Sequence, residues 1–151
     1  MHGRASQGFT LVEMLIVLVI IGIASSVVAL SVGSLTRAPS VEAEARRLAT
    51  HLQAAADDAM LGDRTIAFTV EPHGYGFATA NGKELVARTD PALAFHTLPA
   101  GMVVTLDVKP PVILGVDGSG QPMSAIVESG KQRWIVTYDG MTATAMPAQK
   151  P

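Results

Sequence analysis

The sequence predicts an α+β fold in which a long N-terminal helix packs on antiparallel strands. Three patterns support this fold class: an uncharged run after Glu13, an apolar stripe at helical spacing that ends near Gly62, and short alternating segments from there to the C-terminus. A helix followed by a series of strands is typical of α+β proteins. The 151 residues leave room for one domain of ordinary size beside the N-terminal run.

The N-terminal run has the length and composition of a membrane-spanning helix. Between Glu13 and Arg37 lie 23 residues without a charge. As a helix they extend roughly 34 Å, which exceeds a hydrocarbon core of about 30 Å. The run is longer than the apolar region of a secretory signal peptide, and the small residues 24–26 fall inside it rather than at its end. Arg4 on the short N-terminal side favours a cytoplasmic N-terminus and a translocated C-terminal domain.

Glu13 is a carboxylate at one end of this otherwise uncharged segment. A charge at bilayer depth costs on the order of 2.5–3.5 kcal/mol, so an acid in such a place indicates a function. The alternative is that Glu13 extends to the cytoplasmic headgroups from near the end of the helix.

A second helix is predicted over about residues 40–61. Pro39 breaks or kinks the chain before it, Glu42 and Arg46 form an i,i+4 pair, and Gly62 marks its end. Its narrow apolar stripe is rich in alanine, which allows a sheet to pack closely. This favours an intramolecular core face over a coiled-coil seam. The stripe consists of Val41, Ala45, Leu48, Leu52, Ala55 and Ala59.

Short strands separated by turn residues are predicted after Gly62. Residues 65–70 and 75–79 alternate in polarity on either side of a turn, which predicts a hairpin. The pairs Asn81-Gly82 and Asp139-Gly140 predict two further turns, the second of type I′.

The other strand candidates follow the same alternation. In the segment 133–138, Trp134, Val136 and Tyr138 share one face. Residues 87–100 have no period and are predicted as a loop. The remaining predicted strands are 102–108, 112–116, 124–128 and 141–145.

Composition and charge exclude several classes of function. The chain has no cysteine, which excludes disulfides and thiolate metal sites and suits an oxidising compartment. Its net charge of −2 gives no electrostatic footprint for nucleic acid. Lys131 with Arg133 is the nearest approach to a basic cluster, and the C-terminal tail holds only Lys150.

No motif for catalysis or for a cofactor stands out. None of the histidines lies within metal-ligand spacing of another, and we predict His51 as a helix-surface residue and His73 as a turn residue. Residues 76–83 have five residues between glycines where a phosphate loop has four, and Lys83 precedes an acid. Residues 117–121 lack the bidentate acid of a calcium loop. We therefore expect no enzymatic activity, no metal and no cofactor. The histidines are His2, His51, His73 and His96.

The N-terminal segment Gly8–Glu13 (GFTLVE) and the apolar run after it closely resemble the class III signal of type IV pilins and type II secretion pseudopilins. The resemblance implies a pilin-like fold and cleavage by a prepilin peptidase after Gly8. It implies N-methylation of Phe9 as the new N-terminal residue. It also implies that Glu13, the fifth mature residue, pairs with the N-terminal amine of a neighbouring subunit in a filament.

The second half of the chain resembles one branch of this family, the group of H-type minor pseudopilins (GspH) and the minor pilins FimT and FimU. The resemblance rests on residues 44–60, 65–70 and 74–77, with further support from 118–122 and 134–140. In that group the protein is a low-abundance subunit that helps prime or cap a short periplasmic filament. The filament is thought to push folded exoproteins through an outer-membrane channel.

The resemblance implies an organisation in three parts: a cleaved leader (1–8), a transmembrane and filament-core helix (9–36), and a periplasmic domain (37–151). The expected partners are the prepilin peptidase, other major and minor pseudopilins and the inner-membrane assembly platform. The alternatives are a minor pilin of a type IV pilus and a DNA-binding pilin used in uptake, of which the latter requires a basic patch.

Overall fold

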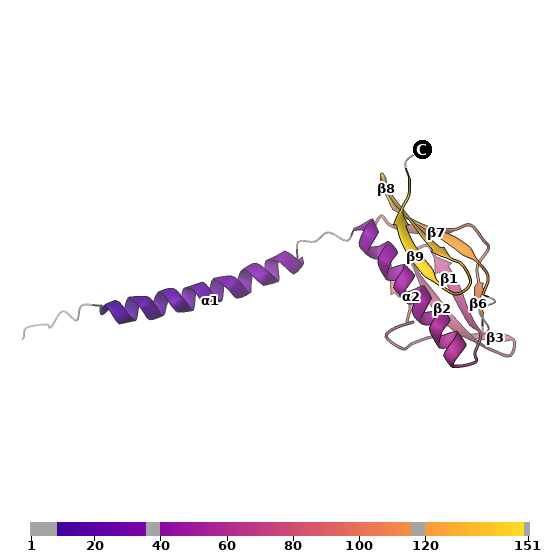
Figure 1. Cartoon of the computed structure of the whole chain (residues 1–151), viewed down its shortest axis with the longest axis horizontal. Coiled ribbons are helices and arrows are strands. Elements are labelled where there is room, and N and C mark those ends of the chain that lie inside the picture. Colours follow the sequence, from indigo (N-terminus) through magenta and orange to yellow (C-terminus); the bar gives the residue numbers. More distant parts are fainter. Residues whose placement is uncertain (1–8, 36–39, 116–119, 150–151) are drawn as a thin grey trace, which may run out of the picture. The chain divides into compact units, whose positions relative to one another are not determined.

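The computed structural model describes residues 9–35, 40–115 and 120–149. The chain forms two compact units, Met1–Ala38 and Pro39–Pro151. The first unit contains helix α1 (Leu11–Leu35), and the second contains helix α2 (Val41–Leu61) and nine strands (Figure 1).

Helix α1 begins with a capped first turn. The Glu13 N–H donates to Thr10 Oγ1 at 3.2 Å, and the Met14 N–H donates to the Thr10 carbonyl, also at 3.2 Å. Thr10 with Glu13 three residues later is the sequence signature of a capping box. The described side chains of α1, from Leu11 to Ile23, are all exposed.

In the part of the chain that the structure describes, no helix is both long and apolar enough to cross a membrane. The membrane span over 9–36 stays a prediction.

Helix α2 confirms the predicted helix over residues 40–61. Ser40 is its N-cap, with an extended backbone (φ −94°, ψ 144°), and Ser40 Oγ accepts from the Ala43 N–H at 3.1 Å. The helix ends at Gly62 as predicted, but Gly62 keeps a right-handed conformation (φ −92°). Asp63 takes the left-handed one instead (φ 46°), which the short polar side chain of an aspartate tolerates.

The strands form two antiparallel sheets. The first has the order β3–β2–β1–β6, with β4 also paired to β2, and the second has the order β5–β7–β8–β9. This arrangement confirms the α+β fold class. The strands are β1 (Ile66–Glu71), β2 (Gly74–Asn81), β3 (Glu84–Ala87), β4 (His96–Thr97), β5 (Val103–Leu106), β6 (Val112–Leu114), β7 (Met123–Ser129), β8 (Gln132–Tyr138) and β9 (Ala143–Pro147).

Two predictions about the strands are wrong. The segment 87–100 is not only loop, because it contains β4, which pairs with the start of β2. The turn at Asp139-Gly140 is not of type I′, because that turn needs positive φ at both central residues and only Gly140 has it (φ 105°). Instead, Asp139 Oδ1 accepts the N–H groups of Met141 (2.9 Å) and Thr142 (2.7 Å) and closes a longer loop.

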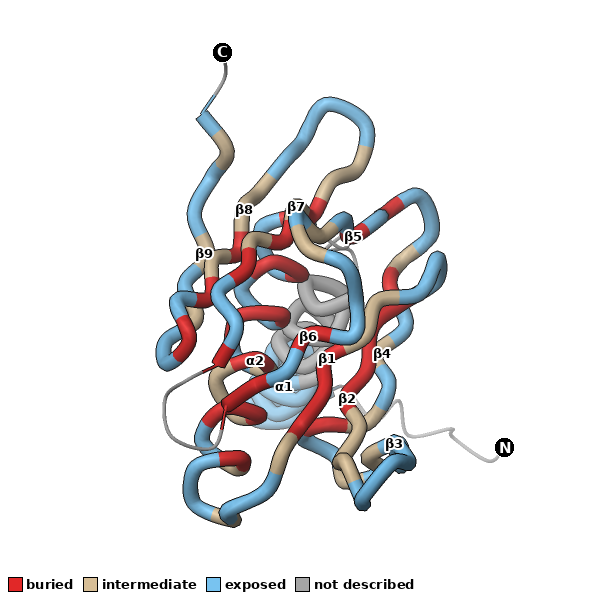
Figure 2. Tube along the Cα trace, turned by 90° about the vertical axis from the view of Figure 1, so that its right-hand side faces the viewer, coloured by how far each residue is buried: buried red, intermediate tan, exposed pale blue. Residues whose placement is uncertain are grey.

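The core lies where α2 faces the two sheets, as the buried positions in Figure 2 show. Every residue of the predicted apolar stripe of α2 is buried, so the stripe is an intramolecular core face. Of the shared face predicted on β8, Val136 and Tyr138 are buried and Trp134 is partly buried against the core. The buried side chains of this core all lie in the second unit, and burying one large side chain contributes about 1.5–3 kcal/mol.

A close approach of backbones fixes the loop that leads into β4. A Cβ added to Gly74 would lie against the His96 carbonyl oxygen and 2.7 Å from the Phe95 ring, and one added to Gly76 would lie 3.1 Å from that ring. The two glycines therefore leave the space that Phe95 occupies over β2. This packing also fixes the position of the next residue, His96, which pairs with Tyr75 of β2.

Candidate functional site

The predicted processing and assembly residues lie at the start of the chain. Gly8 lies outside the described residues. Phe9 is 73% exposed and precedes the first turn of α1, and Glu13 lies in that turn with an exposed side chain. Their roles stay predictions.

The first turn of α1 favours a carboxylate at Glu13 for a local reason as well. Glu13 is the third residue after the N-cap Thr10, where an acid interacts favourably with the positive end of the helix dipole. Any assembly role of Glu13 must therefore be separated from this contribution to the start of the helix.

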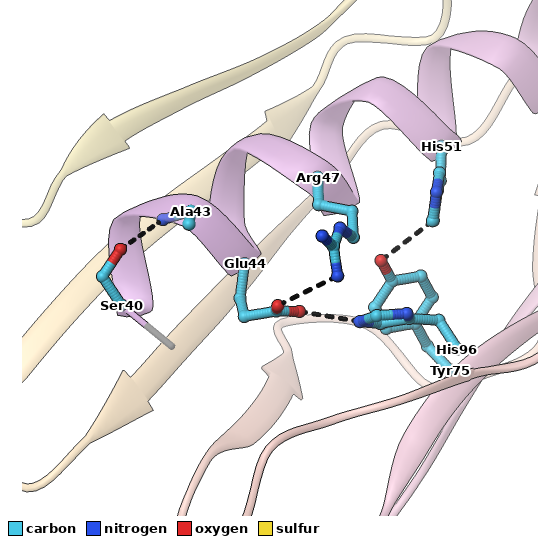
Figure 3. Close-up of polar contacts among 7 residues, drawn as sticks. All are labelled: Ser40, Ala43, Glu44, Arg47, His51, Tyr75 and His96. Carbon is cyan, nitrogen blue, oxygen red and sulfur yellow. Dashed lines mark hydrogen bonds and ion pairs between the residues drawn. The ribbon is translucent and has the colours of Figure 1, made fainter. Parts of the chain in front are cut away.

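A polar cluster in the second unit has no counterpart among the residues predicted from the sequence (Figure 3). At its centre is Glu44 of α2, the one charged residue that is buried among the described residues, at 5% exposure. His96 Nε2 donates to Glu44 Oε2 at 2.7 Å, and Arg47 Nη1 donates to Glu44 Oε1 at 3.3 Å. A buried carboxylate is costly unless it is paired and hydrogen-bonded, and here each oxygen has a partner.

Next to this pair, the Tyr75 hydroxyl lies 3.0 Å from His51 Nδ1. The His96 ring centroid lies 5.1 Å from the Tyr75 centroid and 5.8 Å from the His51 centroid. Burial raises the pKa of the Tyr75 hydroxyl, with a further contribution from Glu44, so the hydroxyl stays neutral and can donate to His51. Burial, followed by the charges of His96 and Arg47, lowers the pKa of His51, and Glu44 opposes this effect.

The prediction of His51 as a helix-surface residue is therefore wrong. Its side chain is only partly exposed and is hydrogen-bonded across to β2. The signal was present in the sequence, because Glu44 and His51 lie four and three residues from the buried Leu48 and therefore on the same side of the helix. His73 lies exposed in the turn between β1 and β2, as predicted.

The cluster joins elements that are far apart in the sequence. The segment between β3 and β5 is bound to α2 at two points. The His96–Glu44 pair connects it to the first half of α2. Arg88, at the start of the segment, donates to Asp58 Oδ2 of α2 and to Asp90 Oδ1, each at 2.7 Å. Over the described ranges no three His, Cys, Asp or Glu side chains are grouped to hold a metal ion. Residues 117 and 119 of the calcium-loop pattern lie outside those ranges.

Replacing His96 with alanine should lower the free energy of unfolding of residues 39–151 by about 1–3 kcal/mol, because it leaves Glu44 buried with Arg47 as its remaining partner. Urea unfolding measures the loss. Arg133→Ala is the matched control, since it breaks an exposed pair with Glu128 (2.9 Å) that is worth about 1 kcal/mol or less. Equal losses in the two variants would contradict a structural role of the buried pair.

Acidification should destabilise the second unit through His51. Because the pKa of His51 is lowered in the folded protein, the unfolded chain binds the proton more readily. The contribution of His51 to stability is complete above pH 6.5, its ordinary pKa, and is lost as the pH falls through the folded pKa. Urea unfolding between pH 8 and pH 5 should show a shallower decline for His51→Gln than for the wild type. Parallel curves would contradict this assignment.

Known proteins resemble both the N-terminal segment and the greater part of the whole chain. Residues 3–29 match the family model described as the prokaryotic N-terminal methylation motif. The chain is 33% identical over 138 residues to type II secretion system protein H of Pseudomonas aeruginosa, covering 85% of this chain and 79% of that protein. It is 28% identical over 112 residues to the protein of the same name from Aeromonas hydrophila, covering 72% of this chain and 61% of that protein.

Solved structures with the same fold include the minor pseudopilin EpsH from the type 2 secretion system of Vibrio cholerae. Two structures of it match with TM-scores of 0.63 and 0.61, at 14% and 15% identity, over 72% and 74% of this chain and 98% and 96% of theirs. These matches confirm the pilin-like fold. Together with the sequence identity to the Pseudomonas protein, which extends over most of both chains, they show that this chain belongs to the type II secretion system protein H family.

Proposed function

We propose that the protein is a minor pseudopilin of a type II protein secretion system. It is a structural subunit that helps prime or cap the periplasmic filament driving exoprotein export. The observation that carries this proposal is the relationship to protein H of Pseudomonas aeruginosa over 85% of the chain, in combination with an N-terminal methylation motif.

The N-terminal residues supply processing and assembly in this proposal. A prepilin peptidase removes residues 1–8, and the amine of Phe9 becomes the methylated N-terminus. Glu13 then pairs with the N-terminal amine of a neighbouring subunit. Opposite charges attract strongly in a low-dielectric environment and each is costly when left alone, so the pair favours correctly assembled subunits.

The proposed location is the inner membrane, with residues 9–36 as a single span and the second unit in the periplasm. The absence of cysteine from the sequence suits an oxidising compartment. The partners are the prepilin peptidase, the other pseudopilins and the inner-membrane assembly platform.

A structural role is favoured over DNA binding and over catalysis. Lys131 and Arg133 come closest to forming a basic cluster. Arg133 already pairs with Glu128, which leaves little free positive charge to bind phosphates. The polar cluster around Glu44 connects a loop to a helix, and its side chains form hydrogen bonds with one another.

Deletion of the gene, with exoprotein secretion, twitching motility and transformation scored side by side, tests the function. We expect secretion to fall while twitching and transformation persist, and the full-length gene to restore secretion. Loss of twitching with intact secretion would reject the proposal in favour of a type IV pilus subunit.

A further inference from the structure

The edge of the second sheet carries outward-facing backbone groups. Strand β9 is the last strand of this sheet, and its N–H and C=O groups alternate between β8 and the open side. The bonds from the Asp139 N–H to the Thr142 carbonyl and from the Ala148 N–H to the Arg133 carbonyl fix this alternation. The backbone groups of Ala143, Ala145 and Pro147 therefore face away from β8.

A side chain of α2 already imitates a neighbouring strand at one end of this edge. Gln53 Oε1 accepts from the Ala143 N–H at 3.0 Å, and Gln53 Nε2 donates to the Met141 carbonyl at 3.2 Å. The amide of Gln53 thus supplies an acceptor and a donor where the backbone C=O and N–H of an added strand would lie. Beyond it, the N–H of Ala145 and the carbonyls of Ala143, Ala145 and Pro147 face the open side.

The space beside this edge is an open groove between α2 and β9, which run next to each other in Figure 1. Small side chains leave room in it for an extended chain. Its lining is Ala49, Thr50, Gln53, Ala54, Asp57 and Ala143.

One end of the groove is acidic. Asp57 forms its rim, and Asp57 and Asp139 both act on the buried Tyr138 hydroxyl, whose pKa is raised first by burial and then by these carboxylates. Hydrogen bonds from the Thr142 and Met141 N–H groups lower the pKa of Asp139. The ion pairs formed within the described ranges include neither Asp57 nor Asp139. Strand β9 itself has no charged residue.

We propose that the groove between α2 and β9 binds an extended segment of a different protein, which pairs with β9 at Ala145 and places a basic side chain beside Asp57. The peptide backbone of the segment supplies N–H groups to the outward carbonyls and a carbonyl to the Ala145 N–H. Its side chains that face α2 are small, to fit beside Ala49 and Ala54.

A second copy of the chain fits this edge poorly. If two β9 strands paired antiparallel around Ala145, each Ala143 would face the Pro147 of the other copy. Pro147 has no N–H to donate, and the Ala143 N–H already donates to Gln53. Only the Ala145 pair would form hydrogen bonds, whereas a partner segment without proline can use all three outward carbonyls.

Photo-crosslinking in cells that carry the secretion system tests the proposal with the full chain. A benzophenone amino acid at Thr50, which is exposed and lines the groove, should give an adduct whose crosslinked peptide, identified by mass spectrometry, contains a lysine or arginine. The same probe at Thr144, which is exposed on the other face of β9, should not give this adduct.

Two substitutions should weaken the Thr50 adduct. Ala145→Pro removes the outward N–H without touching the bonds to β8 and should lower the yield about tenfold. Asp57→Asn removes the charge but keeps an acceptor for Gln53 Nε2, and should lower it about two- to fivefold. Glu71→Gln, at the exposed last residue of β1, is the matched neutralisation and should change nothing. Thermal unfolding of each variant checks that the fold is kept.

Three results would overturn the proposal: no adduct at Thr50, an adduct with a second copy of this chain, or an adduct that Ala145→Pro leaves unchanged. Because the adduct is measured independently of exoprotein secretion, a failure here is distinguishable from a failure of the proposed function.

Discussion

Replacing Gly8 with valine should block removal of the leader, so that full-length precursor accumulates and the methylated Phe9 N-terminus is missing. A peptidase that cuts after Gly8 must approach the backbone closely, and a branched side chain there displaces the scissile bond. Misplacement of about 1 Å costs on the order of 100-fold in rate. The intact mass of the purified chain measures the result.

Gly22 provides the matched control for this experiment. Apart from the adjacent backbone of its own helix, a Cβ added to Gly22 meets nothing within 4 Å among the described residues, so Gly22→Val makes the same change of side chain away from the cleavage site. It should be processed like the wild type. A mature, methylated product from Gly8→Val at the wild-type level would contradict the assignment of Gly8 as the last leader residue.

Local patterns in the sequence were enough to predict the elements that build the core. The apolar stripe of α2 recurs at helical spacing because one face of the helix is covered by sheet, and each of its residues is buried. Alternation identified Val136 and Tyr138 as inward-facing because the pleat of β8 presents every second residue to α2.

The elements that were missed have no such pattern. All four residues of β3 are exposed, so no alternation distinguishes them from a loop. Strand β4 has two residues, and its position depends on the contact of the Phe95 ring and the His96 backbone with Gly74. That contact depends on the folded path of the chain and has no local sequence signal.

The site could be predicted only in part for the same reason. The Gly8–Glu13 motif is contiguous, and its residues can be identified without a structure. The pair between Glu44 and His96 joins residues 52 positions apart. Helical spacing shows that Glu44 lies on the buried face, but which side chain neutralises it follows only from the path of the loop before β5.

Replacing Glu13 with glutamine should leave the subunit processed and inserted but should lower its incorporation into the filament by roughly 100- to 4,000-fold. The variant removes one partner of a proposed charge pair, and leaving the other charge unpaired in a low-dielectric environment costs about 3–5 kcal/mol. Glutamine is chosen over alanine because it also suits the third position of a capping box, so the start of α1 is preserved. Fractionation of filaments and exoprotein secretion measure the loss.

Thr10 separates charge pairing from helix capping. Thr10→Ala removes the acceptor of the Glu13 N–H and should cost the helix about 0.5–2 kcal/mol while leaving the carboxylate in place, and Thr10→Ser should restore the cap. If Glu13 acts by pairing, Glu13→Gln loses secretion and Thr10→Ala largely retains it. If Glu13 contributes mainly to the start of the helix, Thr10→Ala loses secretion and Glu13→Gln largely retains it. The reason is that glutamine can replace glutamate in a capping box, whereas alanine cannot replace threonine as the N-cap. Wild-type secretion by Glu13→Gln would reject the charge pair.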